Sequence, residues 1–299
     1  MSDHSPLARL MPYAAAATGV GCLSLMDAFM KDAALSTGTY TATVLRSLIG
    51  AALIAPFWLW RRTGWPGKAT LKLHVERGVI SALMALTFFY ALTKLPLAEA
   101  IAISFIAPLL ALYFARVLLG EVVQPKAIMA SLLGFLGTLV IVGGRVGQGE
   151  FDRDTALGLG ALSISALLYA YNFIVIRKQS QLAGPVEIAT FHSGVGGLFL
   201  LLGVPFLATP VQSEALFPLL AAGVLTVAGA MAFAWGYARA EAQALVPMEY
   251  TGFLWASIFG WFFFREAVTL PTIAGTALIV TGCWIATRNP RRSRDVAEA

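Results

Sequence analysis

Long apolar stretches separated by short polar segments run the whole length of the chain. Most are about 20 residues long, which is what an α-helix needs to cross a hydrocarbon core of roughly 30 Å. Since only helices satisfy every backbone polar group over such lengths in lipid, each stretch predicts one transmembrane helix. The ten predicted helices cover residues 10–31, 40–60, 78–95, 97–119, 127–144, 156–176, 186–208, 216–237, 244–264 and 270–287.

The hydrophobic pattern occurs twice. The segment Val117–Val123, with the sequence VLLGEVV, corresponds 145 residues later to Phe262–Val268, with the sequence FFFREAV. Each copy closes one apolar stretch, and a glycine follows each glutamate after sixteen residues, at Gly137 and Gly282. The chain is therefore predicted to consist of a first repeat at 1–145, a linker at 146–155, a second repeat at 156–290 and a basic cytoplasmic tail at 291–299.

The front part of each half matches as well, at an offset of 146 residues. Lys31 and Arg46 correspond in this way to Arg177 and His192. Because each half contains five predicted helices, an odd number, the second half enters the membrane in the opposite orientation. The predicted fold is an all-α integral membrane protein of ten transmembrane helices, arranged as two inverted five-helix repeats. Such repeats are typical of secondary transporters, whose substrate site lies near the middle of the bilayer.

The composition agrees with a protein that lies almost wholly in lipid. Hydrophobic residues make up 58% and charged residues 12%, whereas about a quarter of a soluble domain is charged. The mean hydropathy is +0.76, which leaves little room for a soluble domain. Fifteen of the 21 basic residues fall on the side of both termini and five on the other, so the positive-inside rule predicts cytoplasmic termini. The net charge of +5 therefore reflects membrane orientation, and nucleic acid is not an expected partner.

Ionisable residues inside a membrane span are expensive and are functional candidates by default. Asp27 lies near the outer end of the first predicted helix. It either contacts the substrate or forms an intrahelical ion pair with Lys31, four residues later. Arg46 lies in the second helix, where it needs an anionic partner or a water-filled vestibule. We favour a structural partner role for Arg46.

Glu99 and Glu249 open the fourth and ninth predicted helices, each close to a proline. Helix ends lack internal hydrogen-bond partners, so these carboxylates either line a cavity or are exposed loop acids. His192 lies within a span and, like Asp27, could exchange protons during transport; the alternative is a hydrogen bond between helices.

Three further positions are predicted to have structural or gating roles. Glu121 and Glu266 end the fourth and ninth spans, where a packing or capping role at the following turn is the favoured interpretation. Pro108 falls at the centre of the fourth span and interrupts its hydrogen bonds, which predicts a kink with free carbonyls at mid-membrane.

Aromatic and amide side chains deep in several spans predict a pocket. A pocket with aromatic walls and a few hydrogen-bonding groups suits a small amphipathic solute, although for any single one of these residues lipid or helix packing is the favoured interpretation. The candidates for its walls are Tyr90, Tyr169, Asn172, Trp235 and Tyr250.

The chain lacks the sequence patterns of several other functions. Metalloprotease, serine hydrolase and P-loop motifs are absent, so an enzyme is not expected. No filter-like loop points to an ion channel. Cys22 and Cys283 both lie in apolar stretches, which fits packing better than a disulfide framework. We expect no cofactor and no metal.

Several of these features together resemble one known family. They are the segment Leu45–Ala51 (LRSLIGA), Pro108 followed by Leu119–Glu121, and Glu266 in the second copy. Because these features occur in this order and are duplicated, the chain resembles members of the drug/metabolite transporter superfamily that contain two EamA-type domains. It departs from the pattern at His192, where the arginine would stand, and at Arg265, which replaces the glycine before the glutamate.

The resemblance implies a bacterial inner-membrane protein with a central cavity, lined mainly by helices one, three, four, six, eight and nine, with helices five and ten outside. The whole sequence is similar to bacterial exporters of amino acids, including aromatic ones. We therefore expect a transporter that exports small amphipathic metabolites, most of all amino acids, by alternating access.

Two other functions remain open at this point. One is export of nucleosides or drug-like cations, and the other is a membrane enzyme or lipid-binding scaffold. The expected partners are a small-molecule substrate and the lipid bilayer. The sequence leaves open the energy coupling and the oligomeric state, a monomer included.

Overall fold

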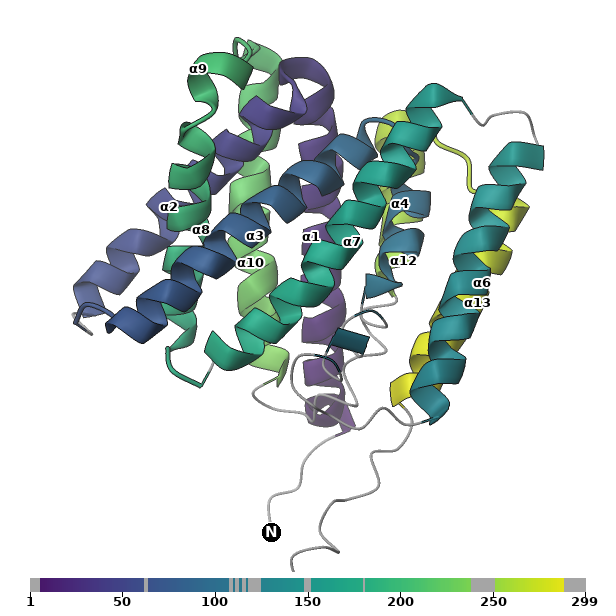
Figure 1. The fold of residues 1–299 in the computed structure, drawn as a ribbon, viewed down its shortest axis with the longest axis horizontal. Coiled ribbons are helices and arrows are strands. Elements are labelled where there is room, and N and C mark those ends of the chain that lie inside the picture. The colour runs from purple at the N-terminus through teal and green to yellow at the C-terminus, as the bar shows by residue number, and fades with distance from the viewer. Residues whose placement is uncertain are drawn as a thin grey trace, which may run out of the picture.

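The chain folds into a bundle of helices in a computed structural model (Figure 1). It describes residues 6–61, 64–107, 110, 113, 114, 117, 125–147, 152–179, 181–237 and 251–287, among which there is no strand. The described elements are α1 (Pro6–Thr37), α2 (Thr39–Arg61), α3 (Lys68–Leu92), α4 (Leu97–Ser104), α6 (Pro125–Gly147), α7 (Arg153–Gln179), α8 (Pro185–Leu201), α9 (Val204–Leu207), the 3₁₀ turn η1 (Ser213–Ala215), α10 (Leu216–Tyr237), α12 (Thr251–Phe264) and α13 (Leu270–Thr287).

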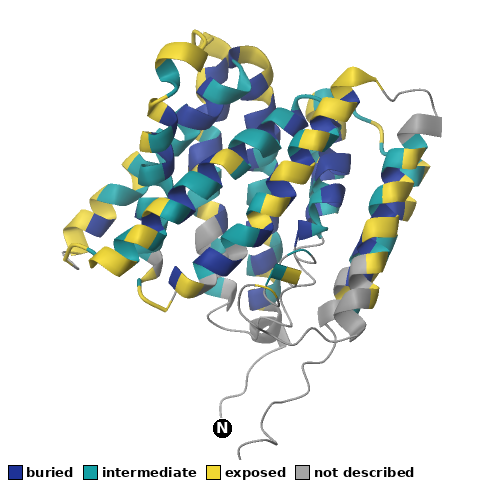
Figure 2. Cartoon of the chain, in the orientation of Figure 1, coloured by how far each residue is buried: buried dark blue, intermediate teal, exposed yellow. Residues whose placement is uncertain are grey.

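Four of the described helical segments are long and apolar enough to cross a membrane: Met11–Thr37, Thr39–Arg61, Lys68–Leu92 and Arg153–Ile176. The outer faces of the bundle carry many exposed residues (Figure 2), and large apolar side chains such as Leu132, Phe135 and Leu136 of α6 are among them. An apolar surface of this extent fits contact with lipid.

Helix boundaries follow the apolar stretches in some places and not in others. α10 and α13 begin and end at the predicted residues, 216–237 and 270–287. α3 begins at Lys68 rather than at residue 78, because its first turns are charged yet helical. The prediction of one helix over 186–208 was wrong, because α8 ends at Leu201 and a turn at Gly203 precedes α9.

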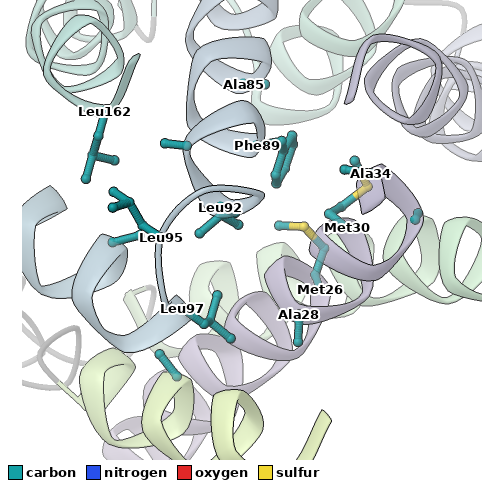
Figure 3. Close-up of a cluster of buried hydrophobic side chains, with 14 of the residues drawn as sticks. Met26, Ala28, Met30, Ala34, Ala85, Phe89, Leu92, Leu95, Leu97 and Leu162 are labelled. Atoms are coloured by element: carbon teal, nitrogen blue, oxygen red, sulfur yellow. The ribbon is translucent and has the colours of Figure 1, made fainter. Parts of the chain in front are cut away.

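Helices from the two halves of the chain pack against each other. The first helix, α1, packs against α10, and α3 packs against α7. α2 packs against α8, and α4 packs against α12. The pair α6 and α13 stands beside the rest of the bundle (Figure 1). A cluster of buried side chains between these helices includes Met26, Met30, Phe89, Leu92 and Leu97 (Figure 3).

α6 and α13 meet through glycine. A Cβ atom at Gly137 would lie 2.5 Å from the carbonyl oxygen of Gly275, and one at Gly275 would lie 2.5 Å from that of Gly137. The two backbones are therefore in direct contact, as is common where small residues line helix contacts in membranes.

Polar contacts also hold the start of α7. Asp152 accepts a hydrogen bond from the backbone N–H of Thr155 at 2.8 Å, which caps the helix and lowers the pKa of this carboxyl. Asp154 accepts one from Lys94, in the turn between α3 and α4, at 2.8 Å, and this contact raises the pKa of Lys94. The first bond caps α7, and the second ties the start of this helix to that turn.

The end of α12 has a well-defined turn. The N–H of Arg265 donates to the carbonyl of Trp261, and the N–H of Glu266 donates to that of Gly260, each at 3.1 Å. Arg265 has φ 58°, the left-handed conformation that such helix ends normally reserve for glycine. The matching residue of the first repeat is Gly120, which lies outside the described residues.

Candidate functional site

A small polar cavity lies between α2, α3, α8 and α10. Its volume is about 50 Å³, and most of its lining residues are small or polar. The lining consists of Arg46, Ser47, Gly50, Ser81, Ala82, Ala85, His192, Ser193, Gly196, Gly223 and Thr226.

Most of the lining comes from matching positions of the two repeats. At offsets of 145 or 146 residues, the pairs are Arg46 with His192, Ser47 with Ser193, Gly50 with Gly196, and Ser81 with Thr226. The glycines allow close approach: a Cβ atom at Gly50 would lie 3.3 Å from Ser193 Oγ, and one at Gly196 would lie 3.2 Å from the carbonyl oxygen of Gly78. The cavity therefore lies where the two halves of the chain meet.

Arg46 is the charged group of this cavity. Its guanidinium lies over the ring of Phe89, 5.0 Å from the ring centroid, and Nη1 approaches Met26 Sδ at 3.8 Å. Its Nε is buried without a hydrogen-bond partner. Asp27 interacts electrostatically with Arg46, but no ion pair within 4.0 Å is found between these two residues.

His192 faces Arg46 from the other repeat. Its Nδ1 is buried without a hydrogen-bond partner, and its electrostatic neighbours are Arg46 and Arg77, both positive. The hydroxyl of Ser47 donates to the carbonyl of Thr43 at 2.9 Å, and that of Thr226 donates to the carbonyl of Ala222 at 2.7 Å. These two hydroxyls therefore donate to their own helices.

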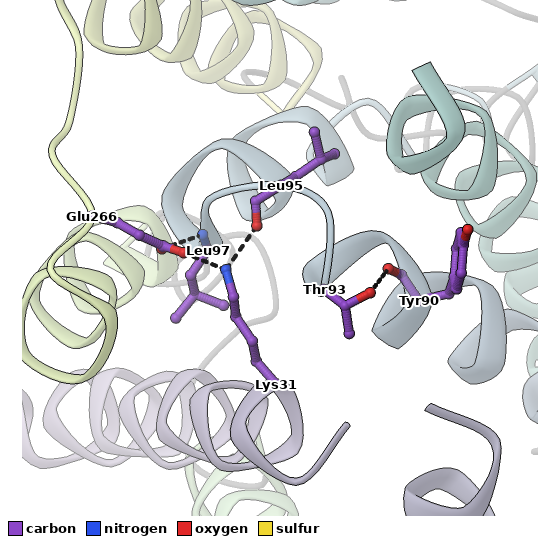
Figure 4. Close-up of polar contacts among 6 residues, drawn as sticks. All are labelled: Lys31, Tyr90, Thr93, Leu95, Leu97 and Glu266. Carbon is purple, nitrogen blue, oxygen red and sulfur yellow. Dashed lines mark hydrogen bonds and ion pairs between the residues drawn. The ribbon is translucent and has the colours of Figure 1, made fainter. Parts of the chain in front are cut away.

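An ion pair links three segments beside the turn between α3 and α4 (Figure 4). Lys31 of α1, whose side chain is buried, pairs with Glu266 and also donates to the carbonyl of Leu95 at 2.8 Å. Glu266 accepts a second hydrogen bond, at 2.7 Å, from the backbone N–H of Leu97, at the start of α4. Lys31 also lies over the ring of Phe264. The contacts join α1, the α3–α4 turn and the end of α12.

Glu266 thus has a capping role, but its partner differs from the predicted one. The sequence favours a cap on the following helix, whereas the carboxylate caps α4, from the other half of the chain. The repeated glutamate was the only sequence signal for this contact.

A second polar cluster joins the first part of α3 to the end of α7 and the start of α8. His74, fully buried, contacts Glu187 at 2.9 Å through Nε2 and Gln179 through Nδ1. Arg77 Nη1 donates to Gln179 Oε1 at 3.1 Å, and the ring of Phe191 stacks on His74 with centroids 4.3 Å apart. Sequence reasoning missed this cluster, because these residues lie near or beyond the predicted span ends and join only through tertiary contacts.

Some of the predicted pocket residues lie near the cavity. Asn172 accepts a hydrogen bond at 3.3 Å from Ser81, which lines it. Tyr169, in α7, is 42% exposed. Tyr90 and Trp235 are half-buried. Tyr250 lies outside the described residues.

The predicted acids are spread more widely. Asp27 interacts electrostatically with Arg46. Glu99 is buried between α4 and α13, where it accepts a hydrogen bond from Thr272 at 3.2 Å. Glu249, Glu121 and Pro108 lie outside the described residues. Within the described part of the chain, no group of three or more His, Cys, Asp or Glu side chains could hold a metal ion.

Relatives of this chain are named as transporters. The pseudopaline exporter CntI of Pseudomonas aeruginosa is 27% identical over 265 residues, which cover 87% of this chain and 90% of that protein. The riboflavin transporter of Brucella anthropi is 26% identical over 70% of this chain and 73% of its own length. The aromatic amino acid exporter YddG of Ancylobacter novellus is 29% identical, over 71% and 75% respectively.

The fold and the repeats also have counterparts. One solved crystal structure superimposes with a TM-score of 0.63 at 21% identity, covering 94% of this chain and 99% of that one, which shows a shared fold. The model of the EamA-like transporter family matches the chain twice, at residues 10–143 and 156–288. The chain therefore belongs to the EamA-like transporter family, within the drug/metabolite transporter superfamily, and is a multi-pass membrane protein.

Proposed function

We propose that this protein exports small amphipathic metabolites, most of all amino acids including aromatic ones, across the bacterial inner membrane. In this proposal ten transmembrane helices form two inverted repeats, both termini are cytoplasmic, and transport follows alternating access. Since the relatives are named as transporters, movement of a solute is favoured over catalysis or a scaffold role.

The observation that carries the proposal is the reciprocal packing of the two halves. The first helix of each half packs against the third helix of the other, as α1 with α10 and α7 with α3. The second helices, α2 and α8, pack against each other, and residues at matching positions enclose the polar cavity beside them. Inverted repeats that rock about such a junction expose a site first to one side and then to the other.

Lys31 and Glu266 then act as a closure at the end predicted to face outward. The pair joins three segments that a rocking motion would separate. A buried pair of this kind is little affected by salt, so its opening depends on the conformational cycle.

The cargo is inferred from chemistry, because the relatives are named for different solutes. A polar cavity whose guanidinium lies over the ring of Phe89 favours a solute with an acidic group and an apolar body. Amino acids, and aromatic ones in particular, combine both. The proposed cavity walls are Tyr90, Tyr169, Asn172, Trp235 and Tyr250, with Asp27, Glu99 and Glu249 as polar groups.

Counterflow in proteoliposomes tests the proposal. Vesicles containing the purified protein and loaded with unlabelled L-phenylalanine should accumulate labelled L-phenylalanine, whereas protein-free vesicles should not. Competition by other amino acids, but not by nucleosides or organic cations, is expected. An imposed pH gradient that raises the initial rate would indicate proton coupling, for which His192 and Asp27 are the proposed groups. Absence of amino acid exchange together with exchange of a nucleoside or a cation would contradict the proposed cargo.

A further inference from the structure

We infer that the cavity between α2, α3, α8 and α10 binds a monovalent anionic group the size of a carboxylate, held by Arg46 and His192. The inference deepens the proposed function and rests on it only where the anionic group belongs to the transported solute.

The first argument is charge. A guanidinium stays protonated in proteins, and burying it without a close counterion costs several kcal/mol. The neighbours in contact with Arg46 are a phenylalanine ring and a thioether sulfur, which carry no net charge. Asp27 acts on it only at longer range, and Arg77 adds a second positive charge near His192. The cavity therefore has a positive potential that an anion would compensate.

The second argument is unused hydrogen-bonding capacity. Buried polar atoms nearly always have a partner, so those without one need an explanation. Arg46 Nε and His192 Nδ1 are two such atoms, contributed by matching positions of the two repeats to one cavity. Arg46 Nε can only donate, and His192 Nδ1 donates in one tautomer. An anionic oxygen or a halide accepts from both.

The third argument is size. A cavity needs roughly 10–15 Å³ for each water molecule that it holds, so about 50 Å³ holds three to five. A carboxylate group has three heavy atoms and fits this space, as does chloride. A whole amino acid does not, so its side chain and ammonium group would extend beyond the cavity. Bulk therefore restricts the ligand to the acidic end of a solute or to a small free anion.

Thermal unfolding of the purified protein in detergent tests binding. The unfolding midpoint is followed by tryptophan fluorescence while sodium acetate or sodium chloride replaces sodium isethionate, a bulkier monovalent anion, at constant ionic strength. A ligand that binds the folded state raises the midpoint in a saturable way. We expect such a rise with acetate, chloride or both. Midpoints that do not change as acetate or chloride replaces isethionate would overturn the inference.

Variants locate the effect. Arg46→Gln should weaken the apparent affinity for the anion about tenfold or more, since hydrogen bonds to charged groups contribute about 1.5–3 kcal/mol. Arg61→Gln, at the exposed end of the same helix, removes the same charge outside the cavity and should leave the affinity unchanged. Ser193→Val fills the cavity while keeping the charge, and it should also weaken binding. It is the variant to use if Arg46→Gln does not fold. A saturable rise that persists in whichever cavity variant folds would overturn the inference.

Two further titrations identify the source of the anion. If the carboxylate of the solute is the ligand, L-phenylalanine should raise the midpoint and compete with acetate, whereas phenethylamine, which lacks the carboxylate, should not. If a free anion is the ligand, L-phenylalanine should not compete, and counterflow should require chloride. Either result supports the site and names its occupant.

The two proposals can fail separately. An Arg46-dependent acetate or chloride effect in a protein that exchanges no amino acid would contradict the proposed cargo and leave the anion site intact. Amino acid exchange without any Arg46-dependent anion effect would leave transport intact and overturn the anion site.

Discussion

Arg265 shows how one residue determines the position of a charged contact. A non-glycine residue in the left-handed conformation costs about 1–2 kcal/mol, and Arg265 adopts it at φ 58°. The turn brings Glu266 within reach of Leu97 and Lys31. The first repeat has Gly120 at the matching position, and glycine adopts the left-handed conformation without that cost.

Replacing Arg265 by glycine should therefore stabilise the protein by about 0.5–1 kcal/mol, because the strained φ is relieved. The thermal unfolding midpoint in detergent measures this. Arg265→Ala is the matched control, since it keeps the strain and removes the guanidinium that lies over Trp261. An equal fall in midpoint for both variants would show that this ring contact outweighs the strain.

The sequence predicted single residues only in part. The repeated glutamate predicted a structural role for Glu266, whose carboxylate pairs with Lys31 and accepts from the N–H of Leu97. Its partners, Lys31 and the N–H of Leu97, lie 235 and 169 residues away, and no local pattern encodes such distances. Asp27, Arg46 and His192 were selected as candidates because charge in an apolar stretch is conspicuous, whereas the small residues that line the cavity give no such signal.

The contact of α6 with α13 leaves no space for a side chain at two glycines. Gly137 and Gly275 bring the two backbones together, so that even one methyl group has no space. Gly143, also in α6, is different, because a Cβ atom added there would meet nothing within 4 Å. This second glycine therefore has space for a side chain.

Gly137→Ala should destabilise the protein by about 1–3 kcal/mol, because the helices must move apart. Gly143→Ala should be neutral or stabilising, since alanine favours a helix over glycine by about 1 kcal/mol. Unfolding midpoints of the two variants, compared with the parent protein in one detergent, give the difference. Equal effects of both substitutions would contradict the close contact.

Helix positions were predictable where charged residues border the apolar stretch. The stretches at 216–237 and 270–287, which lie between Glu214 and Arg239 and between Glu266 and Arg288, correspond to α10 and α13. The start of α3 was missed because Lys68 and Lys72 are helical but not apolar. The end of α8 was missed because apolar side chains continue beyond the turn at Gly203.

For the whole molecule, the proposed inversion has a direct test. The turn between α2 and α3 and the turn that contains α9 lie at opposite ends of the bundle (Figure 1). Trp65 and Pro210 occupy matching positions in these turns, 145 residues apart, and both are exposed. Inverted repeats would place them on opposite sides of the membrane.

Single cysteines at these positions, in a background with Cys22 and Cys283 replaced by serine, should react differently with a membrane-impermeant maleimide. From outside intact cells, Pro210→Cys should be labelled and Trp65→Cys should not, and inside-out vesicles should give the reverse. Labelling of both positions from the same side would rule out the inverted arrangement.

The exchange of arginine for histidine across the cavity has a consequence for how such a molecule can be assembled. Two identical copies of the first half, related by the proposed symmetry, would each contribute a guanidinium to a space of about 50 Å³. At an effective dielectric constant of 20, two positive charges about 4 Å apart repel by about 4 kcal/mol. A homodimer of the first half would meet this repulsion at its centre, whereas the covalent pairing of unlike halves avoids it. Histidine in place of a second arginine at this one position therefore favours the pairing of two unlike halves over the pairing of two identical ones.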